Sequence, residues 1–298
     1  MKYADTSFEA NLDTIPQIPL WVTSARGETL EDVAFLSGAA LAILHLVAVR
    51  EDVPHALMRA RLALYAAEAC VVYSGRSERA GELRDEVYLL RAGDEPGPAG
   101  KTFQAWQRAV ARPISVKTLY QALPAQDAGQ IAVWLDSAAA GGPVERAALV
   151  LEAVLADVPR AEEVALILAD AALAQAMGWK HLMPLLAANL KTRDLMQTGD
   201  ALRLACHQAL VVSAKQAVQM AADLARRRAQ LETVAPKLRA KGAEQAVDLF
   251  LSRDAVSPSI ALSSFMSDRA ARRLCDRLVD LGVVRELTGR DSFRLYGI

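Results

Sequence analysis

The chain has 298 residues, of which 53% are hydrophobic and only 5% aromatic, with 16 glycines and 12 prolines. Alanine and leucine supply most of the apolar content, which excludes a disordered or β-rich chain and predicts packed helices. The net charge of −1 is unevenly spread: residues 226–298 hold fourteen Lys or Arg against nine Asp or Glu, a balance of +5 that leaves −6 for residues 1–225. An acidic body with a basic end is expected where one end of a protein meets a polyanion.

The cysteines and the first residues both indicate a cytoplasmic protein. Cys70, Cys206 and Cys275 are odd in number, far apart, and show neither the pairing of a secreted scaffold nor CxxC metal spacing. Residues 1–11 contain Asp5 and Glu9 and lack the basic region with which an export signal begins. We therefore expect a reducing cytoplasmic environment and no disulfide.

One stretch, residues 33–49, approaches the hydrophobicity of a membrane span. It is seventeen residues long, contains His45, and has the small residues 37–40 at its middle. A span needs about 20 apolar residues, so this segment is predicted to be a central core helix. No membrane partner is expected.

In chain order, residues 1–27 are predicted to be an extended arm, because Ile15-Pro-Gln-Ile-Pro-Leu-Trp carries two prolines among apolar side chains. Thr29, with Asp32 three residues later, resembles a capping box and begins the first helix. Proline- and glycine-rich residues 91–100 form the clearest loop. The remaining helices of the first 252 residues are expected at about 54–73, 77–90, 101–111, 115–122, 126–139, 143–156, 160–177, 181–190, 199–232 and 242–252.

A domain boundary is predicted after the long amphipathic segment 201–231. Arg226-Arg-Arg lies near the end of that segment, where positive charge suits the helix dipole, and Pro236 then breaks the helix. The basic stretch Lys237-Leu-Arg-Ala-Lys leads onward. We expect an all-helical body of about ten helices over residues 1–235 and a second domain over residues 240–298.

The second domain has the pattern of a winged helix-turn-helix. Residues 243–252 and 258–262 are predicted as its first two helices, and a third begins at Ser267 or Asp268 and stops at Gly282. Strand-forming residues then flank Thr288-Gly-Arg-Asp, where Gly289 permits the positive φ of a tight hairpin. One face of the third helix is apolar, formed by Ala271, Leu274, Leu278 and Leu281. The predicted fold class is therefore mainly α, with a C-terminal winged helix that carries a β-hairpin.

Arginines crowd the start of the third helix. The N-terminal part of this helix enters the major groove in helix-turn-helix proteins, so double-stranded DNA is the expected partner. We interpret the chain as a DNA-binding protein, either a transcriptional regulator or a plasmid- or mobile-element-associated factor, whose body serves dimerisation or a protein partner. The predicted DNA-binding residues are Arg269, Arg272 and Arg273 in the major groove, Arg290 and Arg294 on the hairpin, and Lys237, Arg239 and Lys241 in the basic stretch.

The alternative is a non-enzymatic scaffold that uses the winged helix as a protein interface. Asp276, Asp280 and Asp291 favour it, because these carboxylates could pair with the arginines. An enzyme is the third choice. Gly97-Pro-Ala-Gly-Lys-Thr ends like a phosphate-binding loop, but Glu95 stands where its first glycine should be. His45, His55, His181 and His207 occur singly, so we expect no catalytic residue, no metal and no cofactor.

Four stretches of the chain resemble the bacterial family called domain of unknown function 1403, found in rhizobia and their relatives, often on plasmids. The resemblance extends over nearly the whole chain and implies no established activity. The stretches are Glu28-Thr-Leu-Glu-Asp-Val-Ala-Phe-Leu-Ser-Gly-Ala-Ala-Leu, Gly93-Asp-Glu-Pro-Gly-Pro-Ala-Gly, Val234-Ala-Pro-Lys-Leu-Arg-Ala-Lys-Gly-Ala and residues 266–298.

We call the second domain, residues 240–298, the tail. The tail alone is also similar to the winged helix at the C-terminus of many Fic-domain proteins and of a related rhizobial helix-turn-helix family. The shared features are a helix ending in Leu-Gly and a following Thr-Gly-Arg hairpin. The Fic catalytic signature, in which a histidine precedes Pro-Phe, an acidic residue, Gly and Asn, is absent from the sequence. The resemblance therefore supports the architecture of the tail and does not imply AMP transfer.

Overall fold

The computed structural model describes residues 15–298 except positions 26, 92, 139 and 291, and within these residues the chain is mainly helical. The elements are α1 (Leu20–Ser24), α2 (Leu30–Ala48), α3 (His55–Tyr73), α4 (Ala80–Tyr88), α5 (Pro98–Ala111), α6 (Val116–Ala122), α7 (Ala128–Asp136), α8 (Pro143–Asp157), α9 (Glu162–Ala176), η1 (Asp194–Met196), α10 (Gly199–Val234), η2 (Ala235–Lys237), α11 (Ala243–Ser252), α12 (Asp268–Asp280), β1 (Arg285–Glu286) and β2 (Tyr296–Gly297). Most helices lie where the apolar periodicity predicts them.

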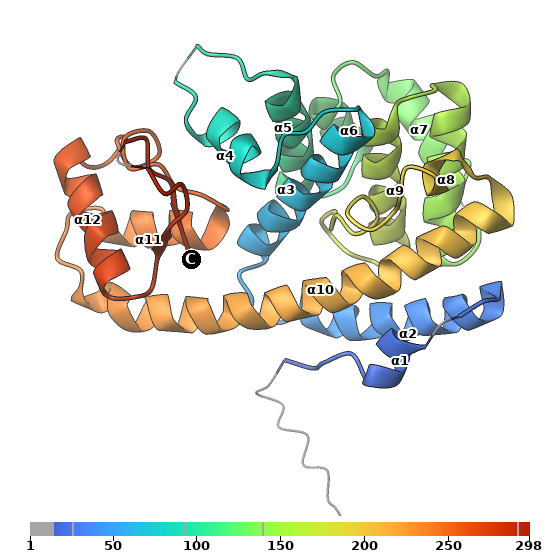
Figure 1. Cartoon of the computed structure of the whole chain (residues 1–298), viewed down its shortest axis with the longest axis horizontal. Coiled ribbons are helices and arrows are strands. Elements are labelled where there is room, and N and C mark those ends of the chain that lie inside the picture. Colours follow the sequence, from blue (N-terminus) through green and yellow to red (C-terminus); the bar gives the residue numbers. More distant parts are fainter. Residues whose placement is uncertain (1–14, 26, 92, 139, 291) are drawn as a thin grey trace, which may run out of the picture.

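Helix α10 organises the molecule (Figure 1). Its 36 residues give it a length of about 54 Å. It packs against α2, α3 and α8, while α11 and α12 lie at its C-terminal end. The end of the long helix predicted at Pro236 is confirmed. Helix α10 ends at Val234, and the short 3₁₀ helix η2 then leads into the tail.

A single apolar cluster runs through the body and into the tail. Its largest fully buried side chains include Trp106, Trp134 and Phe103 in the body and Phe250 in α11. Alanines on the inward faces of α3, α9 and α10 let the helices approach closely. Residues 240–298 therefore pack on the body through a shared core.

The N-terminal helices are well explained by local sequence. The capping box predicted at Thr29 is confirmed: the amide of Asp32 donates to Thr29 Oγ1 at 3.2 Å, and the Thr29 amide donates to Asp32 Oδ2 at 3.4 Å. Of the predicted extended arm, residues 15–19 have no regular structure, α1 follows them with Val22 fully buried, and residues 1–14 lie outside the described residues.

Helix α2 covers α10 with one face and leaves the other exposed. Val33, Leu44 and Val47 are buried, whereas the side chains of Phe35 and Leu46 are exposed. Among the described residues, it is the one helix whose length and apolar composition would suffice to cross a membrane. The sequence predicts a central core helix here, and the structure shows a helix enclosed on one side.

Two predicted helices are wrong. Residues 181–190 form an irregular buried segment, because Pro184 lacks a backbone donor and because Asp170 and Tyr73 bind the peptide groups that a helix would use. Residues 258–262 form turns, in which Ser263 Oγ donates to the Ile260 carbonyl at 2.9 Å.

Two strands of two residues each lie in the region of the predicted hairpin, but the nine residues 287–295 separate them, so the connection is longer than the predicted tight turn. Strands β1 and β2 are antiparallel, with Arg285 opposite Gly297 and Glu286 opposite Tyr296. Gly289 has φ of 62° in the connection, as its place in the sequence suggests. Val256, between α11 and α12, adds a bridge to the other side of Tyr296, with N–O distances of 2.8 and 3.0 Å.

Candidate nucleic-acid interface

Helix α12 is a strongly amphipathic helix with well-formed ends. Ser267 caps its N-terminus by accepting a hydrogen bond from the Ala270 amide at 3.3 Å, and Gly282 follows its C-terminus with φ of 69°. Ala271, Leu274 and Leu278 are buried, as the spacing predicts. The opposite face of the helix is consequently free to carry charge.

A groove of about 580 Å³ runs along one side of α12, against residues 237–240. Leu238, Leu274 and Leu281 contribute to an apolar floor. Four cationic side chains surround it: Lys237, Arg239, Arg273 and Arg277. We call this feature the basic groove. Lys241 follows it in sequence, and Arg269 lies one helical turn before Arg273 on the exposed face of α12.

The eight residues predicted to bind DNA are all exposed, but they differ in charge pairing. In the described part of the chain, five of them have no ion pair: Lys237, Arg239, Lys241, Arg269 and Arg273. Arg272 pairs with Asp268 at 3.0 Å, and Arg290 pairs with Asp85 of α4. The Arg294 guanidinium donates to the Arg290 carbonyl at 2.8 Å.

Sequence reasoning overlooked Arg277. It lines the basic groove next to Arg273 and has no ion pair with any described residue. Its position, four residues after Arg273, is the signal that could have found it, because residues at i and i+4 lie on adjacent turns of one helix face.

Two of the three acidic residues of α12 lie in its C-terminal half, and the third, Asp268 in the first turn, is paired with Arg272. Asp276 and Asp280 are exposed, and neither forms an ion pair with a described arginine. Tyr296 Oη lies 3.5 Å from Asp276 Oδ1, at the side of α12 that faces β2. Positive charge therefore dominates the first turns of the helix and the basic groove beside it.

The side of the tail that faces the body carries a buried ion cluster. Asp254 is fully buried, and its Oδ1 accepts hydrogen bonds from Arg61 of α3 at 3.1 Å and from Arg84 of α4 at 3.2 Å. Arg61 also donates to the backbone carbonyl of Ile298 at 2.9 Å. We call Asp254, Arg61 and Arg84 the latch, because they join the tail to two body helices.

The features for which the sequence predicts no chemistry have structural partners. The loop at Lys101 holds no free anion site: Glu86 Oε2 accepts a hydrogen bond from the Gly100 amide at 2.6 Å, and Lys101 pairs with Glu95. His207 Nδ1 lies 2.7 Å from Ser37 Oγ, and Trp179 donates to His45 at 3.0 Å. Among the described residues, no three His, Cys, Asp or Glu side chains come together as a metal site.

All three cysteines are buried, and none of them forms a disulfide. Burial raises the pKa of the Cys206 and Cys275 thiols to about 12 and that of Cys70 further still, because a thiolate loses its hydration there. A buried thiol of this kind is a weak nucleophile and packs as a small apolar group.

Comparison with protein families agrees with the resemblance noted in the sequence. The model of the family described as "Protein of unknown function (DUF1403)" matches residues 6–298. The chain belongs to this family. The search of curated proteins returned no match. The match covers both the helical body and the tail, so the basic groove lies within the region that the family model describes.

Proposed function

We propose that residues 240–298 form a winged helix-turn-helix that binds double-stranded DNA. The order of elements supports this: α11, the bridging Val256, the turns before Ser267, α12, and then the β1–β2 hairpin. A winged helix has this order with a second helix before the recognition helix, and in this chain residues 258–262 form turns at that place. In this interpretation α12 is the recognition helix.

The observation that carries the proposal is a set of six exposed cations of residues 237–277, four of them around the basic groove, that have no carboxylate partner in the described chain. They are Lys237, Arg239, Lys241, Arg269, Arg273 and Arg277. In a chain of net charge −1, such a cluster leaves uncompensated positive charge in one place. Phosphate groups of a polyanion supply the missing partners.

The positions of these residues suggest their roles. Arg269 and Arg273, in the first turns of α12, would reach base edges in the major groove, where arginine binds guanine bidentately. Lys237, Arg239 and Arg277, around the basic groove, would contact the phosphates that flank it. The body then serves as a platform for dimerisation or for a protein partner, in a transcriptional regulator or a plasmid- or mobile-element-associated factor.

Fluorescence anisotropy with labelled genomic fragments tests the proposal. The double variant Arg273→Ala/Arg277→Ala should bind about 30-fold more weakly than wild type, because two charge-assisted contacts are lost. The matched control is Arg226→Ala/Arg228→Ala on α10, which removes the same charge from arginines already paired with Asp223 and Glu232. Equal affinity of wild type and the Arg273/Arg277 variant would reject DNA binding by this surface.

A second candidate function follows from the apolar floor of the basic groove. Leucines flanked by cations suit an acidic amphipathic helix of a protein partner, which would lay its apolar face on Leu238 and Leu281. Leu281→Gln separates the two candidates, because it keeps every charge and removes part of the floor. A protein partner would be lost from this variant, whereas DNA affinity should remain within about twofold of wild type.

A further inference from the structure

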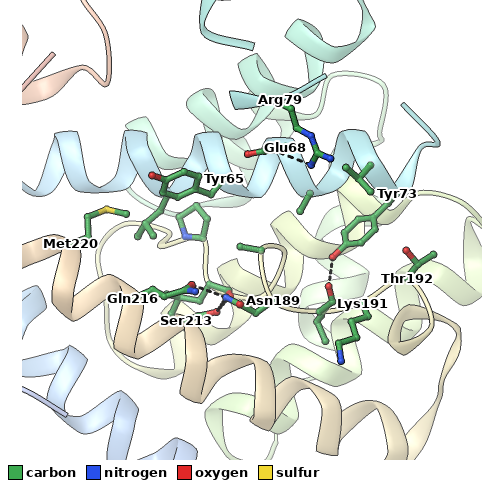
Figure 2. Close-up of a pocket in the computed structure, with 17 residues that line it drawn as sticks. Tyr65, Glu68, Tyr73, Arg79, Asn189, Lys191, Thr192, Ser213, Gln216 and Met220 are labelled. Carbon is green, nitrogen blue, oxygen red and sulfur yellow. Dashed lines mark hydrogen bonds and ion pairs between the residues drawn. The ribbon is translucent and has the colours of Figure 1, made fainter. Parts of the chain in front are cut away.

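A cavity of about 650 Å³ lies in the body, far in sequence from the basic groove (Figure 2). Its walls come from α3, from residues 184–192 and from α10. The apolar part of the lining includes Leu62, Ala69, Val72, Pro184, Leu185 and Met220. Pockets that hold small molecules have volumes of about 300 to 1,000 Å³ and mostly apolar walls, so this cavity has the expected size and lining.

One buried and one half-buried polar side chain, Asp170 and Tyr73, hold the irregular wall of the cavity in one conformation. Asp170, which is fully buried, accepts hydrogen bonds from the amides of Leu185 and Leu186 at 3.1 and 3.2 Å. Tyr73 Oη lies 2.7 Å from the carbonyl oxygens of both Ala187 and Leu190. Burying the Asp170 side chain to fix a segment without helical hydrogen bonds is costly, which indicates that the shape of this wall matters.

Polar groups with unused hydrogen-bonding capacity line the cavity. The Asn189 amide nitrogen donates to Ser213 Oγ at 2.8 Å and to Gln216 Oε1 at 3.0 Å (Figure 2). No hydrogen bond within the described chain uses the side-chain oxygen Oδ1 of Asn189 or the side-chain nitrogen Nε2 of Gln216. A ligand can therefore both donate to and accept from this wall.

The charged side chains at the cavity favour an anion. Arg79 is 71% exposed and lies 3.6 Å from Glu68, a contact too long and too solvated to neutralise it fully. Lys191, on the opposite side, has no ion pair among the described residues. The cavity lining thus carries two positive charges, on Arg79 and Lys191, and one negative charge, on Glu68.

We propose that this cavity binds a small amphipathic molecule: an apolar body the size of two or three rings, or a short chain, that carries one anionic group. The apolar body lies between α3 and Leu185, and the anionic group lies toward Arg79 or Lys191. This site is independent of the DNA-binding proposal, because it shares no residue with the basic groove.

Two fluorescent probes test the site with the full chain. 8-Anilinonaphthalene-1-sulfonate is an aromatic body with one anionic group, and N-phenyl-1-naphthylamine is the same body without the sulfonate. Ala69→Trp and Ala188→Trp each fill part of the cavity, whereas Ala222→Trp places the same side chain on a separate groove along α10. Unfolding midpoints in urea show which variants keep the fold.

Both filling variants should weaken binding of both probes at least about tenfold, and Ala222→Trp should leave it unchanged. Arg79→Gln/Lys191→Gln should weaken binding of the sulfonate probe about tenfold and that of the neutral probe less than about twofold. Probe binding that survives in both filling variants would overturn the site, and equal losses for the two probes in the charge variant would overturn the anionic class. Arg273→Ala should affect neither probe, so failure here and failure of DNA binding are distinguishable.

Discussion

The two sides of the tail use arginine in opposite ways. On the side that faces the body, Arg61 and Arg84 of the body pair with the buried Asp254 of the tail, and Arg290 of the tail pairs with Asp85 of the body. On the side of the basic groove, Arg273 and its neighbours have no carboxylate partner in the described chain. The paired arginines join the tail to the body, whereas the unpaired arginines of the basic groove keep their charge for a partner.

The difference shows that the pairing of a cation, and not its presence, identifies a candidate interface. A buried pair holds elements together because the loss of one partner leaves an isolated charge in a low-dielectric place. An exposed cation without a partner contributes little to folding and keeps its charge for binding. The following experiments remove one partner of an ion pair at a time and measure the effect on stability or on DNA binding.

The largest effect is expected at the latch. Asp254→Ala leaves Arg61 and Arg84 without their buried counter-ion and should lower the free energy of unfolding by about 3 to 5 kcal/mol. Urea denaturation followed by circular dichroism measures this change.

The control for the latch is Asp268→Ala, which removes an exposed partner of Arg272 and should cost less than about 1 kcal/mol. Because Ser267 keeps the helix cap in this variant, the loss reports mainly on the ion pair. Similar losses in the two variants would contradict the distinction between buried and exposed pairs.

A smaller effect is expected at the wing. Asp85→Asn removes the negative charge that faces Arg290, so the hairpin should gain a cation available to phosphate. DNA affinity should rise about fivefold and the salt dependence should steepen by about 0.9 in slope. Anisotropy titrations of the variant and of Asp85→Asn/Arg290→Gln measure it, because the second substitution should abolish the gain. A gain that persists in the double variant would show that Arg290 does not reach DNA.

The smallest effect concerns acid stability. Burial lowers the pKa of His207, because the charged imidazolium would lose hydration beside Ser37. The unfolded chain therefore binds a proton that the folded chain resists, and stability is lost as pH falls below the usual histidine pKa of 6.5. Urea denaturation at pH 7 and pH 5 should show a smaller loss for His207→Gln than for wild type. An equal loss would exclude His207 as a source of acid sensitivity.

Much of the fold could be predicted from local sequence signals. The capping box at Thr29, the break at Pro236 and the Ser267 cap with Gly282 all depend on residues close together in the chain, and the structure contains each of them. The helix predicted over residues 181–190 failed because its hydrogen bonds go to Asp170 and Tyr73. Nothing within the segment itself reveals those partners.

The candidate interface was predictable to a similar degree. Exposure of the arginines on α12 follows from amphipathic spacing, and the structure agrees. The pairing of Arg290 with Asp85, 205 residues away in the chain, has no sequence signal. The latch was equally invisible, because Asp254 looks in the sequence like any surface acid in a turn.

The most direct test of the central claim is the salt dependence of DNA binding by the full chain. If about five phosphates are neutralised, log affinity should fall against log salt concentration with a slope of about −4.5. The slope should decrease in magnitude by about 0.9 in Arg273→Ala/Arg277→Ala, since Arg277 is the phosphate-facing cation that this variant removes. A flat response in wild type, or equal slopes in the two proteins, would contradict the claim that the unpaired cations of the basic groove bind DNA.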